Sequence, residues 1–210
     1  MAGRMSAESL PMEVRPVTLE GSFVRLEPLS MAHHAGLSEV GLDQELWEWI
    51  PEPVRTPEEM RAYIEEAIAA QAAGTALPFA TVERSSGRAI GSTRFGNIDR
   101  RHRRVEIGWT WLARPWQRTR ANTEAKSLML RHAFETWGAI RVELKTDSLN
   151  ARSRAAILRL GAKEEGILRN HMIMPSGRYR DSVYLSIIEA EWPEIKAGLE
   201  AKLGDVERDA

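Results

Sequence analysis

The chain has 210 residues, of which 43% are hydrophobic and 28% charged, so its composition is that of an ordinary globular protein of one domain. It contains no cysteine, which excludes disulfides, thiolate metal ligands and a cysteine nucleophile, and its net charge of -1 argues against bulk attraction to nucleic acid or anionic lipid. The chain shows neither an apolar signal-peptide core nor a membrane-spanning run, so we expect a cytoplasmic protein with no nucleic-acid or membrane partner. We expect a mobile leader at 1–20, a single domain at 21–203 and a disordered tail at 204–210.

The first predicted elements are a strand and two helices. In the stretch FVRLEPLS, residues 23–30, apolar and polar side chains alternate with the period of a half-buried strand. Ser30 is a candidate N-cap for a short helix through 31–41. A longer helix opens at Thr56, which is followed by Pro and two Glu, and Gly74 closes it.

An antiparallel meander of three strands is predicted next. The segment 77–98 holds two β-rich runs around a Ser-Ser-Gly turn, and 103–113 continues them as RRVEIGWTWLA. The third strand is expected to direct four apolar side chains to one face, namely Val105, Ile107, Trp109 and Trp111.

The second half of the chain alternates helices and strands. A helix at 123–137 carries an apolar stripe at i, i+3 and i+4 spacing, which predicts that one of its faces packs on the sheet. The remaining predicted elements are a strand at 141–147, a helix at 150–161, strands at 165–174 and 179–189, and a helix at 191–203. This order predicts an α/β (α+β) fold in which helices cover the faces of a mixed sheet.

The segment QRTRAN, residues 117–122, joins the meander to the helix at 123–137. The first amides of a helix lack intrahelical partners, and the helix dipole adds positive potential there, so an anion fits this junction. Arg118 and Arg120 would add charge, and Asn122 or Thr123 would cap the helix. Without further information, a solvated connection with two exposed arginines is the simpler interpretation.

Four stretches together resemble the GCN5-related N-acetyltransferases (GNAT), and in particular the branch related to ribosomal-protein N-terminal acetyltransferases. They are VEIGWTWLARPWQRTRANTEAKSLMLRHAF, VELKTDSLNARSRAAILRLGA, EGILR and YRDSVYLSI, and the resemblance covers residues 20–200. It implies a mostly antiparallel sheet of about seven strands with helices on both faces. It also implies that acetyl-CoA binds at a V-shaped split between two neighbouring strands, with its pyrophosphate on the loop 117–122.

The resemblance assigns a set of residues to the cofactor. The family's loop usually reads Gln/Arg-x-x-Gly-x-Gly/Ala, but here Arg120 and Asn122 occupy the two small positions, a change that could narrow or weaken the site. We expect binding to be retained because the start of the helix and the downstream stretch DSLNARS are intact. Asn150 is expected to bond the pantetheine arm, although an N-cap role would explain it as well. By position, the residues implied are Trp111, Leu112, Gln117, Arg118, Thr119, Arg120, Ala121, Asn122, Thr123, Asn150, Arg152 and Ser153.

Attack of an amine on a thioester requires a neutral amine, an oxyanion donor and an acid for the thiolate. By family position, the oxyanion donor is the backbone amide of Leu112 or a neighbour. Glu106 is the candidate general base, and the alternative is a structural pair with Arg94 or Arg104. Tyr184 is the candidate acid, and the alternative is core packing. Asp147 and Ser148 are weaker candidates.

The acceptor side is less specific. Trp47, Trp49 and Trp109 are candidates for substrate binding, against the alternative of core packing. The five histidines lack metal-ligand spacing, and there is no phosphate loop, dinucleotide fingerprint or nucleophile elbow. The sequence thus favours an N-acetyltransferase that moves acetyl from acetyl-CoA to a protein N-terminus, a lysine or a small amine. The alternatives left open are a catalytically silent CoA-binding scaffold or sensor and a transferase of longer acyl groups, and a homodimer is left open as well.

Overall fold

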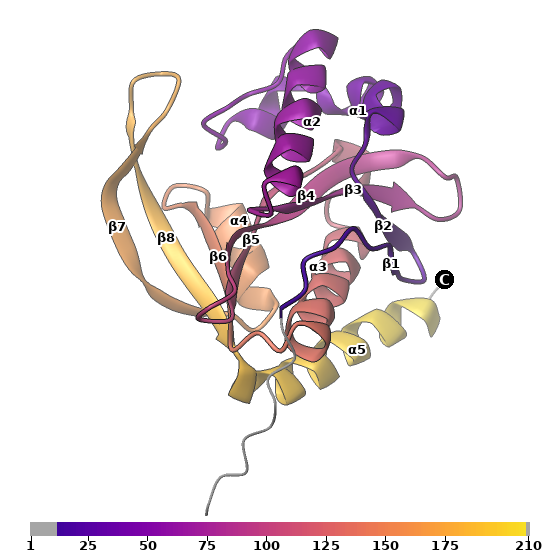
Figure 1. Cartoon of the computed structure of the whole chain (residues 1–210), viewed down its shortest axis with the longest axis vertical. Helices are drawn as coiled ribbons and strands as arrows, with labels where there is room; N and C mark the ends of the chain where they lie inside the picture. The colour runs from indigo at the N-terminus through magenta and orange to yellow at the C-terminus, as the bar shows by residue number, and fades with distance from the viewer. Residues whose placement is uncertain (1–11, 209–210) are drawn as a thin grey trace, which may run out of the picture.

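An eight-stranded sheet crosses the molecule in a computed structural model that describes residues 12–208 (Figure 1). The strands are β1 (Leu19–Glu20), β2 (Val24–Pro28), β3 (Leu77–Glu83), β4 (Ala89–Asp99), β5 (Arg104–Leu112), β6 (Arg141–Asp147), β7 (Lys163–Ile173) and β8 (Tyr179–Ile188). Their spatial order is β1-β2-β3-β4-β5-β6-β8-β7, and every neighbouring pair is antiparallel except β5 and β6, which are parallel. The mostly antiparallel sheet expected from the sequence is confirmed.

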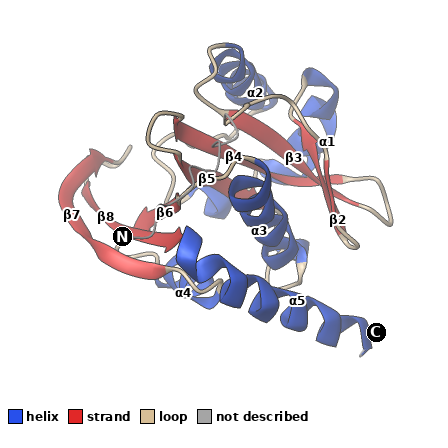
Figure 2. Cartoon of the chain, turned by 60° about the horizontal axis from the view of Figure 1, so that its bottom comes forward, coloured by secondary structure: helices blue, strands red, loops and turns tan. Residues whose placement is uncertain are grey.

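Five α-helices occur in the described chain, namely α1 (His34–Gly41), α2 (Pro57–Ala72), α3 (Ala121–Arg131), α4 (Ala151–Arg159) and α5 (Trp192–Arg208). In Figures 1 and 2, α1 and α2 lie on one face of the sheet, whereas α3, α4 and α5 lie on the other. A π-helical turn, His132–Thr136, continues α3. The prediction of helices on both faces is therefore confirmed.

Both ends of α2 follow the capping residues read from the sequence. The Thr56 side chain accepts a hydrogen bond from the amide of Glu59 at the start of α2, and Pro57 fills the first position, where no amide donor is needed. After the helix, Gly74 adopts a φ of 72°, a left-handed conformation that glycine reaches without a Cβ penalty. These caps explain why the bounds of α2 were predictable.

The helices enclose two apolar cores. The larger core lies between the sheet and α3, α4 and α5, and it includes Phe95, Met129 and Trp137. The smaller core lies under α1 and α2, and it includes Met60 and Trp111. The apolar stripe predicted for the helix at 123–137 is buried in the larger core, because Ala125, Leu128, Met129, Ala133, Phe134 and Trp137 all belong to it.

The prediction that four side chains of β5 share one face is wrong. Val105 and Ile107 face the larger core, whereas Trp111 lies in the smaller one. Trp109 has a φ of 50°, and the β4–β5 register shifts at this point, so an extra residue reverses the alternation. The Trp109 ring packs directly over Gly96, because a Cβ atom on Gly96 would lie only 2.4 Å from the ring.

Parts of the predicted leader and tail lie in regular structure or in contact with the core. Met12 is buried in the larger core, and the indole of Trp137 donates a hydrogen bond to the carbonyl of Glu13 at 3.0 Å. The predicted leader at 1–20 includes Met12 and Glu13, and its first eleven residues lie outside the described chain. The predicted tail at 204–210 overlaps the end of α5, which runs to Arg208.

Glu124 attaches α3 to the start of β2. Its buried carboxylate accepts hydrogen bonds from the amides of Ser22, Phe23 and Val24 at 2.6 to 2.8 Å, and from the Ser22 hydroxyl at 2.8 Å. The carboxylate is thus the hydrogen-bond acceptor for three backbone amides at the start of β2. These bonds hold α3 at a fixed position along the sheet.

Candidate active site

The two parallel strands separate soon after they meet. β5 and β6 pair at three positions, from Arg104 opposite Arg141 to Glu106 opposite Glu143, whereas β5 continues to Leu112 and β6 to Asp147. Beyond the pairing, the edges of both strands are free of each other and form a V-shaped opening. The split expected from the family resemblance is therefore present in this fold.

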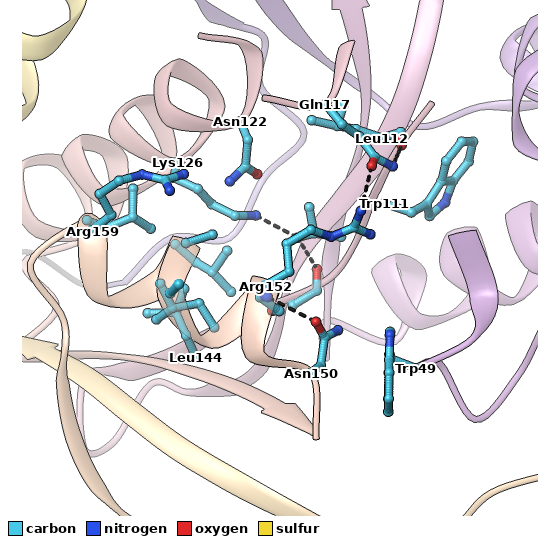
Figure 3. A pocket seen from close by; sticks show the side chains of 18 of the residues that line it. Trp49, Trp111, Leu112, Gln117, Asn122, Lys126, Leu144, Asn150, Arg152 and Arg159 are labelled. Atoms are coloured by element: carbon cyan, nitrogen blue, oxygen red, sulfur yellow. Dashed lines mark hydrogen bonds between the residues drawn. The ribbon is translucent and has the colours of Figure 1, made fainter. Parts of the chain in front are cut away.

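A cavity of about 500 Å³ lies at this split (Figure 3). Its wall combines the second half of β5, the loop before α3, the first turns of α3 and α4, and the segment around Trp49. Of the predicted cofactor residues, those that line it are Trp111, Leu112, Gln117, Arg118, Thr119, Asn122, Thr123, Asn150, Arg152 and Ser153. The fold thus brings residues that are distant in the sequence together around one cavity.

The loop before α3 is held by side-chain hydrogen bonds at its first residue. The Gln117 amide nitrogen donates to the carbonyl of Leu112 at 2.8 Å, and its amide oxygen accepts from Arg152 at 3.1 Å. Arg118 follows with a φ of 63°, so the left-handed position of the loop is occupied by an arginine. Gln117 therefore links the end of β5 to the first turn of α4 across the cavity.

Two of the predicted loop residues lie outside the cavity wall. The Arg120 guanidinium is 4.7 Å from the ring centre of Phe23, and Ala121 is buried in the larger core. Arg120 has a φ of -67°, an ordinary helical value that requires no glycine. The missing small residue at this position therefore does not distort the backbone of the loop.

The predicted cap of α3 is wrong. The helix begins at Ala121, two residues before the predicted start, and the amide of Ala121 donates to the Thr119 hydroxyl at 3.2 Å. That hydroxyl in turn donates to the carbonyl of Trp116 at 2.7 Å. Asn122 and Thr123 are therefore free of the capping role and line the cavity instead.

Asn150 caps a helix and also lies in the cavity wall, so its position is compatible with both roles that the sequence left open. Its side-chain oxygen caps α4 by accepting from the amide of Ser153 at 2.9 Å, and the residue also lines the cavity. In Figure 3 its side chain lies at the start of α4, near Trp49. The cap fixes the position of the Asn150 amide group relative to the cavity.

Glu106 is buried at the vertex of the split. Its Oε2 accepts from the Lys145 ammonium at 3.0 Å and from the Asn97 side chain at 2.6 Å, so its partner is neither Arg94 nor Arg104. Its Oε1 lies 3.0 Å from the position of a Cβ on Gly108, which lines the cavity although Glu106 itself does not. Oε2 is thus engaged by Lys145 and by one side-chain amide, whereas Oε1 lies beside the backbone of Gly108.

Tyr184 lies on the same side of the sheet as this ion pair and outside the cavity wall. Its ring centre is 6.0 Å from the Lys145 ammonium and 5.7 Å from the ring centre of His171. Burial, together with the charges of Lys145 and Arg180, lowers the pKa of His171. Its surroundings therefore favour the neutral form of the imidazole beside Tyr184.

The three tryptophans predicted for the acceptor side differ in placement. Trp47 is buried in the smaller core, and its indole donates to the carbonyl of Gly41 at 2.7 Å, which makes it a core residue. Trp49 and Trp109 are only half-buried, and both line the cavity. The guanidinium of Arg94 lies 5.2 Å from the Trp109 ring centre.

Several charged residues at the site were not among those predicted from the sequence. Lys126 and Lys145 both line the cavity. The buried carboxylate of Asp147 pairs with Arg178, whose guanidinium lies 5.9 Å from the Trp49 ring centre, so Asp147 is already engaged. The sequence of α3 does not single out Lys126, because this helix also carries Glu124, Ser127 and Arg131.

Two negative findings apply to the described part of the chain. No group of three or more His, Cys, Asp or Glu residues in it could hold a metal ion. None of its helices is long and apolar enough to cross a membrane.

Comparisons with known proteins agree with this geometry. Residues 24–163 match the family model of the acetyltransferase (GNAT) domain. YdaF of Bacillus subtilis, named as a ribosomal N-acetyltransferase, is 32% identical over 106 residues, which are 50% of this chain and 57% of that protein. The chain thus matches little more than half the length of this curated relative.

Solved structures match over more of the chain. A GCN5-related N-acetyltransferase from Brucella melitensis is 31% identical with a TM-score of 0.84, and the match covers 89% of this chain and 85% of that one. RimJ of Mycobacterium smegmatis, solved in complex with CoA-disulfide, is 25% identical with a TM-score of 0.75 over 85% of this chain and 88% of its own.

Proposed function

The chain belongs to the GNAT acetyltransferase family, and from that membership we propose that it transfers an acetyl group from acetyl-CoA to a primary amine. The observation that carries the proposal is the split between β5 and β6, which opens into a cavity lined by the loop and helix ends of the site. The first acceptor class to test is a protein N-terminus, because a relative is named as a ribosomal N-acetyltransferase.

The donor is proposed to enter between α3 and α4. Anions are favoured where helices begin, and the first turns of both helices border the cavity together with Arg118 and Arg152. The pyrophosphate is assigned to this end, and the pantetheine arm to the groove between β5 and α4. Asn150 is assigned to the arm, because its cap holds the amide group at the cavity wall.

The acceptor is proposed to approach from the side of Trp49 and Trp109. This side lies beneath α1 and α2, where the Lys145 and Glu106 pair closes the vertex of the split. The amine must be neutral to attack, so a proton acceptor is needed beside it. We assign this role to Glu106, whose Oε1 faces the cavity wall at Gly108, through an intervening water.

The reaction then needs two further groups. Attack places negative charge on the thioester oxygen, and the free edge of β5 offers backbone amides to it, with Leu112 or a neighbour as the assigned donor. Departure of the thiolate needs an acid, and Tyr184 is assigned to it although it stands outside the cavity wall. No side chain with a reactive thiol exists in this chain, which is consistent with direct transfer.

The scaffold alternative was based on Arg120 and Asn122, which replace two small residues of the family's loop. Arg120 has ordinary helical dihedrals and its guanidinium lies against Phe23, whereas Asn122 lines the cavity. Donor binding without turnover is the outcome that would favour this alternative.

A transfer assay tests the proposal. The purified chain is incubated with acetyl-CoA and a panel of peptides that carry the N-terminal sequences of ribosomal proteins, and acetylated products are identified by mass spectrometry. Matched peptides with a blocked N-terminus and free lysines separate the two amine classes, and a set of small polyamines covers the third. The proposal predicts product in at least one arm, and tight donor binding without product in any arm would contradict it.

A further inference from the structure

The chain uses lysine sparingly, and two of its few lysines share one cavity. Only five of its 29 basic residues are lysines, and the rest are arginines. Lys126 and Lys145 line the cavity at the split, whereas Lys163, Lys196 and Lys202 lie on β7 and α5 and do not. A lysine can lose its proton in a protein, whereas an arginine cannot. Lys126 and Lys145 are therefore the two residues of the cavity wall whose side chains can become a nucleophilic amine.

Lys126 is held in the cavity wall by hydroxyl groups. Its ammonium donates to the hydroxyls of Thr93 at 2.9 Å and Thr110 at 2.6 Å, and only 5% of the residue is exposed. Figure 3 shows the side chain reaching from α3 toward β5 within the cavity lining. The nitrogen makes two hydrogen bonds, so its remaining bonding direction is available to a group in the cavity.

No carboxylate in the described chain stabilises the charge of Lys126. Burial alone lowers its pKa to about 7, because desolvation disfavours the ammonium form. The charged groups that share the cavity are Glu45, Arg118, Lys145, Arg152 and Arg159. A large fraction of Lys126 is therefore the neutral, nucleophilic amine at physiological pH.

Lys145 provides the contrast within the same cavity. Its Nζ contacts the Oε2 atom of Glu106 at 3.0 Å, so this nitrogen is already engaged by a buried carboxylate. The two lysines thus differ in their partners, because Lys126 contacts hydroxyl groups and Lys145 contacts a carboxylate.

We propose that Lys126 is a self-acylation site, at which the chain acetylates its own buried amine with acetyl-CoA bound in the cavity. The proposal rests on the proposed use of acetyl-CoA. The neutral Nζ attacks the thioester carbonyl carbon, a C–N bond forms, and the C–S bond breaks so that the CoA thiolate leaves with the electron pair. The proton lost by nitrogen passes to the thiolate or to water, and the products are Nζ-acetyl-lysine and CoA.

Acetylation would change the cavity in two ways. It abolishes the protonated form, which no carboxylate of the described chain stabilises, and the remaining N–H can still donate to Thr93 or Thr110. The added acetyl group occupies space beside β5 that the donor requires. We therefore expect the modified chain to bind acetyl-CoA less tightly, so that self-acylation limits activity when acetyl-CoA is abundant and acceptor is scarce.

The test uses the full-length chain and acetyl-CoA with a ¹³C-labelled acetyl group, without any acceptor. Intact mass spectrometry counts the acetyl groups added, and peptide mapping locates them. A truncated acetyl thioester of N-acetylcysteamine serves as a donor without the nucleotide. The proposal predicts one labelled acetyl on Lys126, added at least about tenfold faster by acetyl-CoA than by the truncated donor. Lys145 and the three other lysines are expected to stay at the background level.

Two variants and one binding measurement complete the test. Lys126→Arg keeps a cation that cannot be acylated and should abolish the labelled site, whereas Lys196→Arg, on α5 and outside the cavity wall, should leave it. Acetyl-CoA binding is measured by titration calorimetry on the same preparation. If acetyl-CoA binds and Lys126 stays unlabelled, the self-acylation proposal is overturned and the proposed function stands. If acetyl-CoA does not bind at all, both are overturned. Label confined to Lys163, Lys196 and Lys202 also overturns self-acylation.

Discussion

Arg118 adopts the left-handed backbone conformation in the proposed phosphate loop, with a φ of 63°. A side chain there costs about 1 kcal/mol that glycine avoids. Arg118→Gly should therefore be more stable than Arg118→Ala by about that amount in chemical denaturation, while both lose the same guanidinium. Both variants should weaken acetyl-CoA binding equally. Equal stability of the two would show that the conformation is not strained.

Glu106 is the residue on which the proposed proton transfer depends. Glu106→Gln should lower turnover about 100-fold at pH 7 and less at pH 9, where more of the amine is already neutral. Glu143→Gln is the matched control, because Glu143 is opposite Glu106 in the strand register but pairs with Arg141. A parallel loss at every pH would instead identify Glu106 as the structural partner of Lys145.

Some residues of the site could be predicted from the sequence and others could not. The loop 117–122 and Asn150 could be found because family motifs and capping rules both point to them. Lys126 was missed because a lysine in a helix is ordinarily on the surface, although it lies three and four residues before the buried Met129 and Leu130. The pairing of Glu106 with Lys145 depends on strand register across a parallel pair, which no local pattern contains.

At the level of secondary-structure elements, α4 tests whether Asn150 has one role or two. Asn150→Ala removes the helix cap and should cost about 1 kcal/mol of stability, whereas Asn150→Ser retains a capping oxygen. If the amide also binds the donor, both variants should raise the KM for acetyl-CoA. Normal kinetics in both variants, with a lower melting temperature for the alanine, would leave only the cap.

The contact between α3 and β2 depends on Glu124. Glu124→Ala leaves three amides in a partly buried position without their acceptor, and we expect a loss of about 3 kcal/mol or more in the free energy of unfolding. Glu200→Ala is the control, since it removes an exposed carboxylate that pairs with α3 through Arg131 and should change stability by about 0.5 kcal/mol or less. Similar losses in the two variants would contradict the structural role given to Glu124.

The elements differ in how far the sequence predicts them. β6 agrees with its predicted bounds because alternation and flanking signals coincide there. The faces of β5 were assigned incorrectly because the bulge at Trp109 shifts the alternation by one residue, and nothing in RRVEIGWTWLA marks where the extra residue lies. The early start of α3 was missed because Thr119, outside the helix, supplies the capping oxygen.

The stability of the whole molecule should depend on pH through Lys126. Burial lowers its pKa from 10.5 to about 7, so between these values the unfolded chain binds more protons than the folded chain. The free energy of unfolding should therefore rise with pH in this window, by about 2 kcal/mol from pH 7 to pH 9. Lys126→Met should lose this rise in urea titrations. The same slope in both proteins would contradict the lowered pKa.

The split between β5 and β6 is the feature that joins the sheet, the helix ends and the loop into one site. Its function is tested most directly by titration calorimetry of acetyl-CoA into the purified chain, with dephospho-CoA and desulfo-CoA as controls. We expect binding in the micromolar range with one molecule per chain, and Arg118→Ala should weaken it. No detectable binding, or binding unaffected by that substitution, would contradict the assignment of the cavity to the donor.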